Sequence, residues 1–306
     1  MFQIWTVGVF LSALILFGAA ENYEGDLSIE NEMQSPDEQP QCGQGSPAFQ
    51  ESDLNVTDGQ ARPGEFPWTV AVSHHKKFVC GGSLITPNIV LTSANCVYNK
   101  MAEDLVVSAG EWEYGNASEK YPYEEQIVKK LVFHKSFSLR TGANNLALLF
   151  LEKEFPMTYR INTICLPTEK RTLNSTRCIA AGWGKNQFKD KHNASILKKI
   201  DVPIVPRDIC QDQLRQTRMG RTFTLAPNLF CAGGEEGKDA CTGDGGGALF
   251  CPMPEDPKRF EQIGIVNWGV GCKNKNVPGI YTDVFEYKSW IVELMEGPTG
   301  TVTDKN

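Results

Sequence analysis

The chain has 306 residues, with 37 acidic and 30 basic side chains and a formal net charge of −7. Residues 21–41 hold seven acidic residues and no basic one, so residues 42–306 balance at 30 of each. Neither part has the basic surplus of a nucleic-acid-binding surface, which argues against a nucleic-acid partner. The roughly 265 residues after the acidic segment are enough for one sizeable all-β domain or two small barrels that share a core.

The N-terminus has the pattern of a secretory signal peptide. An apolar run at 7–17 is followed by small residues at 18–20, and acidic sequence begins at Glu21. This pattern predicts cleavage after residue 20 and a secreted, extracellular product. The alternative is a membrane anchor, but the run is short for a span, so we expect no membrane association. Residues 21–41 and 297–306 are predicted to be flexible tails. A pro-segment or a docking site for a basic partner is the alternative for 21–41.

Ten cysteines follow residue 41, and an even number in a secreted chain predicts a disulfide framework. A zinc site is the alternative, but no Cys-x-x-Cys pair occurs. Four Asn-x-Ser/Thr sequons are candidates for glycosylation, which requires an exposed loop. These sequons begin at Asn55, Asn116, Asn174 and Asn193.

Short apolar runs separated by turn residues predict antiparallel β structure along most of the chain. Residues 42–64 are rich in Gly, Pro, Ser and Asp and are predicted to form an extended strap. Strands are predicted at 66–72, 79–85, 89–92, 105–109, 126–133, 146–151, 178–182, 198–204, 248–251, 262–268 and 279–284. Near the end, Tyr287, Trp290, Ile291 and Leu294 form one apolar stripe with helical spacing. A further helix is predicted at 211–218.

Six motifs in order give the chain a specific resemblance over residues 42–296. They lie at 65–68, 80–85, 91–96, 181–184, 241–248 and 267–272. Together they resemble chymotrypsin-like and trypsin-like serine proteases. The resemblance implies an all-β fold of two six-stranded antiparallel barrels with a C-terminal helix, formed by residues 65–296. It also implies five disulfides, which are Cys42–Cys165, Cys80–Cys96, Cys178–Cys251, Cys210–Cys231 and Cys241–Cys272.

All three catalytic positions that the resemblance identifies are substituted. Gly245 stands where the family has its nucleophilic serine, and glycine has no side chain that can be acylated. Asn95 stands at the position of the general base, and an amide does not take up a proton near neutral pH. Asn145 replaces the carboxylate that orients the base. We therefore expect no endopeptidase activity and no cofactor. The alternative is an active trypsin-like endopeptidase with non-standard residues such as Thr242.

The surroundings of the catalytic positions are retained. Gly243 and Asp244 match the family's oxyanion loop. Asp239, Gly269 and Gly279 match its primary specificity pocket, which implies a carboxylate able to hold Arg or Lys from a partner. The alternative, which we favour here, is an inherited pocket that stays shielded, because no basic cleavage residue precedes the position of the family's new N-terminus. The sequence names no partner for Asp244.

Within the family, the chain looks similar to the inactive clip-domain protease homologues of arthropods. The segment before Cys42 lacks the cysteines of a complete clip domain. The resemblance implies a protein-binding cofactor or regulator, in an extracellular protease or innate immune cascade, with proteases, zymogens or inhibitors as partners. The loop between Glu111 and Glu125 is longer than the family's calcium loop, so we expect no metal.

Overall fold

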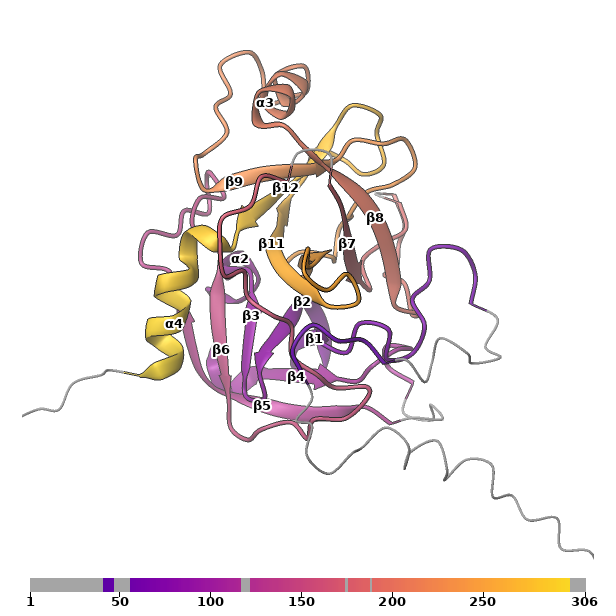
Figure 1. The fold of residues 1–306 in the computed structure, drawn as a ribbon, viewed down its shortest axis with the longest axis vertical. Coiled ribbons are helices and arrows are strands. Elements are labelled where there is room, and N and C mark those ends of the chain that lie inside the picture. Colours follow the sequence, from indigo (N-terminus) through magenta and orange to yellow (C-terminus); the bar gives the residue numbers. More distant parts are fainter. Residues whose placement is uncertain (1–40, 47–55, 117–121, 174–175, 188, 298–306) are drawn as a thin grey trace, which may run out of the picture. The chain divides into compact units, whose positions relative to one another are not determined.

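The computed structural model describes residues 41–46, 56–116, 122–173, 176–187 and 189–297 (Figure 1). All of them belong to one compact unit, Gln39–Asn306. The predictions for the signal peptide, for residues 21–40 of the acidic tail and for 298–306 lie outside these residues. Within the described ranges, no helix is long and apolar enough to cross a bilayer.

The first half of the unit is a closed antiparallel barrel. Its strands are β1 Thr69–His74, β2 Lys77–Thr86, β3 Ile89–Thr92, β4 Leu105–Ala109, β5 Glu124–Phe133 and β6 Ala147–Leu151. They pair in the order β1-β2-β3-β6-β5-β4. Aliphatic side chains such as Val72, Leu84 and Leu149 point inward and are fully buried. The short helix α2 (Ala94–Val97) and the 3-10 turn η2 (Ala102–Asp104) lie between β3 and β4.

The second half repeats the architecture. Its strands are β7 Arg177–Gly182, β8 Lys198–Val205, β9 Leu229–Gly233, β10 Ala248–Pro252, β11 Phe260–Trp268 and β12 Pro278–Asp283, and they close in the order β10-β11-β12-β9-β8-β7. Helix α3 (Arg207–Arg215) follows β8, and the 3-10 turn η3 (Phe285–Tyr287) leads into the C-terminal helix α4 (Lys288–Glu296) (Figure 1). The two-barrel fold with a C-terminal helix is therefore confirmed.

Most predicted strands agree with the structure to within two residues at each end, and the largest differences are at two places. The first strand begins at Thr69 and not at residue 66, because the Thr69 N–H turns back to the Phe66 carbonyl, and Pro67 has no N–H to offer a ladder. Strand β9 was not predicted, since its five residues, Leu229–Gly233, are short and end in glycine. It forms because it closes the second barrel between β12 and β8. Helix α3 begins at Arg207, four residues before the predicted start.

The two barrels share a core that is rich in aromatic side chains. Phe66, Trp68 and Phe250 pack with ring centroids between 5.0 and 6.0 Å apart. The same cluster continues through Trp183, which is fully buried. A buried hydrogen bond of 2.6 Å from the Ser83 hydroxyl to Gln262 joins β2 to β11. These contacts position the loops that carry the candidate site.

The described part of the strap is docked onto the domain. Cys42 is bonded to Cys165, the Gly43 N–H donates to the Thr163 carbonyl at 2.7 Å, and the Phe260 N–H donates to the Gly43 carbonyl at 2.8 Å. Gly43 has a φ of +74°, and a Cβ there would lie 2.1 Å from the Phe260 carbonyl oxygen. Only glycine permits this approach of two backbones.

Four of the five predicted disulfides are present, and the fifth is a correction. Cys42–Cys165, Cys178–Cys251, Cys210–Cys231 and Cys241–Cys272 are bonded. Cys80 and Cys96 are paired as predicted, but they are thiols in hydrogen-bond contact. The Cys80 sulfur lies 3.5 Å from the Thr92 hydroxyl, and that of Cys96 lies 3.1 Å from the Ser93 hydroxyl. Burial raises the pKa of Cys80, which keeps its proton, and the hydrogen bond from Cys80 lowers the pKa of Cys96.

The substitution Gly43→Ala tests whether the strap is a stabilising part of the domain. We expect a loss of about 2–4 kcal/mol in the free energy of unfolding, measured in urea, because the new Cβ breaks the contact with Phe260. The matched control is Gly59→Ala, which also has a positive φ, of +81°, but has nothing within 4 Å of the new Cβ. The control should lose only the backbone cost of about 1–2 kcal/mol. Equal losses in the two variants would contradict the docking role.

Candidate functional site

Gly245 lies in the loop between Cys241 and β10, against the first barrel. Its carbonyl accepts a hydrogen bond from the Gly81 N–H in β2 at 3.0 Å and lies 3.8 Å from the Cys96 sulfur. A Cβ built at Gly245 would meet nothing within 4 Å. The loop therefore has the space for a side chain at this position but presents only backbone.

Asn95 and Asn145, the other two positions that are predicted to be vacant, are joined by an amide network. The Asn95 N–H donates to the Asn145 side-chain oxygen at 2.9 Å, and the Asn145 amide nitrogen donates back to Asn95 at 3.2 Å. Asn145 is 1% exposed and also donates to the Asn267 side chain at 2.6 Å. Asn267 in turn donates to the Gly142 carbonyl at 2.8 Å. The network holds the residues in place with neutral hydrogen bonds and supplies no proton acceptor for a hydroxyl.

Asn267 was not predicted as a site residue. It occurs in one of the six motifs, where the resemblance drew attention to the following glycine and cysteine. Its role appears only when β11 and the loop before β6 are brought together, since 122 residues separate Asn267 from Asn145. In the sequence, the one available signal for this role was an amide side chain within the apolar run of β11.

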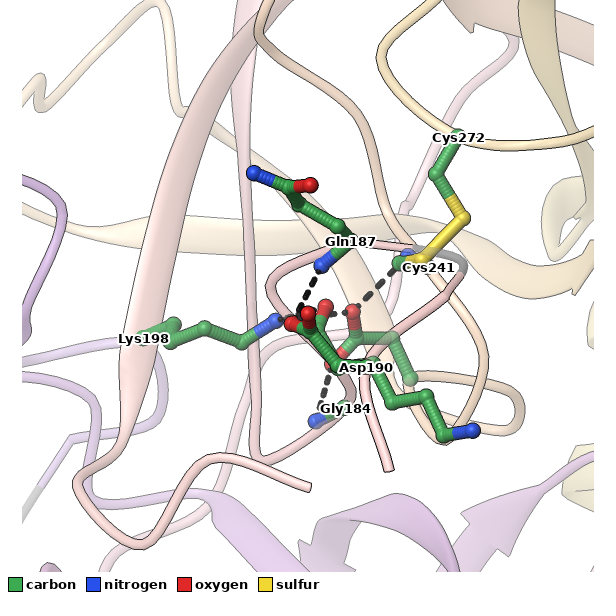
Figure 2. Close-up of polar contacts among 8 residues, drawn as sticks. Gly184, Gln187, Asp190, Lys198, Cys241 and Cys272 are labelled. Atoms are coloured by element: carbon green, nitrogen blue, oxygen red, sulfur yellow. Dashed lines mark hydrogen bonds and ion pairs between the residues drawn. A yellow bond between two sulfur atoms is a disulfide. The ribbon is translucent and has the colours of Figure 1, made fainter. Parts of the chain in front are cut away.

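The partner that the sequence left open for Asp244 is Lys198. The Lys198 ammonium lies 3.4 Å from one carboxylate oxygen of Asp244 and also donates to the Lys185 carbonyl at 3.0 Å. The same carboxylate accepts the Cys241 N–H at 2.9 Å and the Gly184 N–H at 2.7 Å. Figure 2 shows Lys198 extended toward this cluster beside Gly184 and the Cys241–Cys272 disulfide. One buried carboxylate thus joins the loop of Gly245 to β8 and to the segment that follows β7.

The motif at 181–184 provides the room for this carboxylate. A Cβ at Gly182 would lie 2.6 Å from an Asp244 oxygen, and one at Gly184 would lie 2.4 Å from the carboxyl carbon. The register of β7 with β8 sets Gly182 opposite Lys198, so the same two strands bring both the space and the cation. Beside them is a cavity of about 10 Å³, roughly the room for one water. It is lined by Ala180, Ala181, Gly182, Lys198, Lys199, Ile200, Asp239, Ala240 and Asp244.

The pocket residues Asp239 and Gly279 come together as predicted, and Gly269 lies in the loop that the Cys241–Cys272 disulfide fastens to them. Asp239 is 6% exposed, and one of its oxygens accepts the Lys273 N–H at 3.2 Å. A Cβ at Gly279 would lie 3.2 Å from the other oxygen. Burial raises the pKa of Asp239 to about 7, and the neighbouring Asp244 charge adds to the rise. A buried carboxylate with a raised pKa favours a cationic ligand, since such a ligand stabilises its ionised form.

The oxyanion loop retains its backbone shape at Gly243, whose φ is +98°. A Cβ there would lie 3.0 Å from the side chain of Asn193, so this exposed sequon borders the loop. Asn116 is half-buried, and its side chain donates to Glu113 at 2.8 Å. Asn55 and Asn174 lie outside the described residues. Of the four glycosylation candidates, Asn193 has the most accessible position that the structure describes.

Thr242 and the histidines are the side chains that an alternative catalytic chemistry would use. Thr242 is exposed, and within the described residues no hydrogen bond joins its hydroxyl to a histidine. His134 packs against Tyr287 and Trp290, and burial lowers its pKa. In the loop between Glu111 and Glu125, the Glu111 carboxylate accepts the Gly115 N–H at 3.2 Å. None of these contacts forms a nucleophile–base pair within the described part of the chain.

The substitution Lys198→Met tests the ion pair with Asp244. The side chains are 17% and 9% exposed, so removal of the ammonium leaves a nearly buried carboxylate without its cation. We expect a loss of about 2–3 kcal/mol in unfolding free energy. The matched control is the next residue, Lys199→Met, whose partner Glu65 is 25% exposed, and it should lose less than about 1 kcal/mol. A loss in Lys198→Met no larger than in the control would show that Asp244 does not depend on Lys198.

Comparison with known proteins agrees with this geometry. The family model described as Trypsin matches residues 56–291. The chain is 43% identical over 255 residues to phenoloxidase-activating factor 2 of Galleria mellonella, covering 78% of this chain and 84% of that protein. It is 40% identical over 261 residues to inactive CLIP domain-containing serine protease A3 of Aedes aegypti, covering 83% of this chain but 54% of that protein.

A third relative is inactive CLIP domain-containing serine protease A8 of Anopheles gambiae, with 35% identity over 84% of this chain and 72% of that protein. Two of these three relatives carry the word inactive in their names, and all three are insect proteins. With the two closed barrels and the trypsin-family match, the predicted family is confirmed: the chain belongs to the trypsin family of serine proteases and their homologues, of the arthropod clip-domain type.

Proposed function

We propose that this chain is a secreted, catalytically inactive serine protease homologue that acts as a protein-binding cofactor or regulator in an extracellular protease cascade. The observation that carries the proposal is the amide network of Asn95, Asn145 and Asn267 beside Gly245. Serine protease chemistry requires a nucleophile and a base that accepts its proton. Amides and a glycine provide neither group, while hydrogen bonds keep the loops in place.

The retained pocket supports binding as the remaining activity. Burial destabilises the ionised form of Asp239, and this is why its pKa is raised. The Lys198 ammonium supplies a positive charge beside the Asp244 carboxylate. The loop next to the pocket therefore has a cation without proteolytic cleavage of the chain upstream. We therefore place the primary ligand contact at Asp239, and we infer a partner that presents Arg or Lys from a loop. Proteases, zymogens and protease inhibitors are the classes with such loops.

The relatives support the same role. Inactive CLIP domain-containing serine proteases give the precedent for a non-catalytic chain, and the name of the Galleria mellonella protein refers to phenoloxidase activation. By analogy we place this chain in an innate immune cascade, in the extracellular fluid. Secretion agrees with the disulfides, which persist in oxidising compartments.

Because Asp239 is 6% exposed, the proposed pocket must open for a ligand, and binding of benzamidine, a small aromatic cation, tests this. We expect the affinity to be constant above pH 7 and to fall about tenfold per unit below it, because the cation binds the ionised Asp239 and protons compete for that carboxylate. Calorimetry across pH 5.5–8.5 measures this dependence. In Asp239→Ser, binding should be weak and independent of pH. Equal affinity in native chain and variant would exclude the pocket as a ligand site.

The variant Gly245→Ser tests the loss of catalysis. The open space at Gly245 lets the variant fold. We expect no turnover of a broad peptide library and no labelling by a phosphonate probe, because Asn95 cannot take the serine proton. A triple variant with Asn95→His and Asn145→Asp added is the positive comparison. Hydrolysis by Gly245→Ser alone, or by the native chain in a manner that Thr242→Ala abolishes, would contradict the proposal.

A further inference from the structure

A cluster of possible metal ligands lies on the first barrel. His74 ends β1, His75 begins the turn that leads to β2, and Asp104 ends η2 just before β4. Ligand atoms of the three side chains, an imidazole nitrogen from each histidine and a carboxylate oxygen, all lie within 4.8 Å of one another. These residues belong neither to the amide network nor to the Asp239 pocket.

The distances converge on one carboxylate oxygen. The Nε2 atom of His74 lies 4.0 Å from Oδ2 of Asp104, and the Nε2 atom of His75 lies 3.9 Å from the same oxygen. The two imidazole rings are 4.0 Å apart between centroids. In a tetrahedral zinc site with bonds of 2.0–2.1 Å, ligand atoms are about 3.3 Å apart. Small side-chain rotations around a central ion are therefore enough to form such a site.

The backbone holds the three residues together before any ion binds. Strand pairing sets His74 opposite Leu105, the residue after Asp104. The His75 N–H approaches the Asp104 carbonyl at 3.4 Å. His75 and Lys76 have positive φ values of 49° and 63°, a conformation that non-glycine residues adopt rarely and that occurs in tight hairpin turns. The turn thus places adjacent imidazoles on the side where Asp104 lies.

The donor set selects the type of ion. Two imidazole nitrogens and one carboxylate oxygen suit Zn²⁺ and similar transition metals, whereas Ca²⁺ and Mg²⁺ prefer oxygen ligands. The side chains of His74, His75 and Asp104 are 29%, 65% and 34% exposed, which leaves a coordination position for water. Lys76 in the same turn and Lys77 at the start of β2 repel a bound cation. Both side chains are exposed, so solvent and salt screen their charges.

We propose that His74, His75 and Asp104 form a surface site for a divalent transition metal, with Zn²⁺ as the ion that the ligands fit best. The bound ion fastens the β1–β2 turn to η2, two segments that are otherwise joined at this point by one long backbone hydrogen bond. The site is independent of the proposed pseudoprotease role, since it uses none of the residues of the pocket or of the vacant catalytic positions.

Calorimetric titration of the tag-free secreted chain with ZnCl₂ tests the proposal. We expect one ion per chain and a rise in Tm on zinc addition, with CaCl₂ giving neither effect. The variants His74→Gln, His75→Asn and Asp104→Asn should each weaken zinc binding at least about tenfold. Asn is chosen at residue 75 because it tolerates a positive φ, so the turn is kept while the imidazole is lost. His192→Asn, at another exposed histidine, is the matched control and should bind as the native chain does.

The variants need a folding check that does not use zinc. Their circular dichroism and their Tm without metal should match those of the native chain, and benzamidine binding at the distant pocket should be unchanged. Zinc binding that is absent at millimolar concentration in the native chain overturns the proposal. Binding that persists unchanged in all three cluster variants, or that is lost equally in His192→Asn, also overturns it.

Discussion

The ion pair between Asp244 and Lys198 is the contact on which the candidate site depends. Asp244 receives two backbone N–H groups and one ammonium, and it lies where the Cys241 loop meets β7 and β8. A carboxylate this deeply buried is stable only with such partners. Because Lys198 belongs to the same chain and to a barrel strand, the compensation is present as soon as the second barrel folds. The loop that carries Gly243 and Gly245 is positioned by the fold itself.

The positioned loop presents only backbone at Gly245, and the neighbouring side chains are held in place by hydrogen bonds. Asn145 uses both its oxygen and its amide hydrogens, so no polar atom of this buried side chain is left unsatisfied. The proposed loss of catalysis is therefore compatible with a retained shape, which a binding module with a protease fold requires.

Most of the fold could be predicted because it depends on local patterns. Short apolar runs located eleven of the twelve strands, and the six motifs identified the barrels and the cysteine partners. The prediction failed at β9, whose five residues carry little periodic signal and are ordered by pairing with β8 and β12. The expected bond between Cys80 and Cys96 also differs: the two sulfurs are neighbours as the resemblance implied, but they are thiols in contact with the hydroxyls of Thr92 and Ser93.

The sequence by itself determined the family and the two-barrel architecture. It also supports the proposed loss of catalysis, because the identity of a residue decides whether it can attack a carbonyl or take up a proton. Only the tertiary structure decided which side chains contact one another. Lys198 is 46 residues from Asp244, and Asn267 is 122 residues from Asn145. His74 and Asp104 meet through the pairing of β1 with β4. Such contacts arise from strand register and barrel closure, which bring together side chains that are distant in the sequence. The local pattern of residues does not encode them.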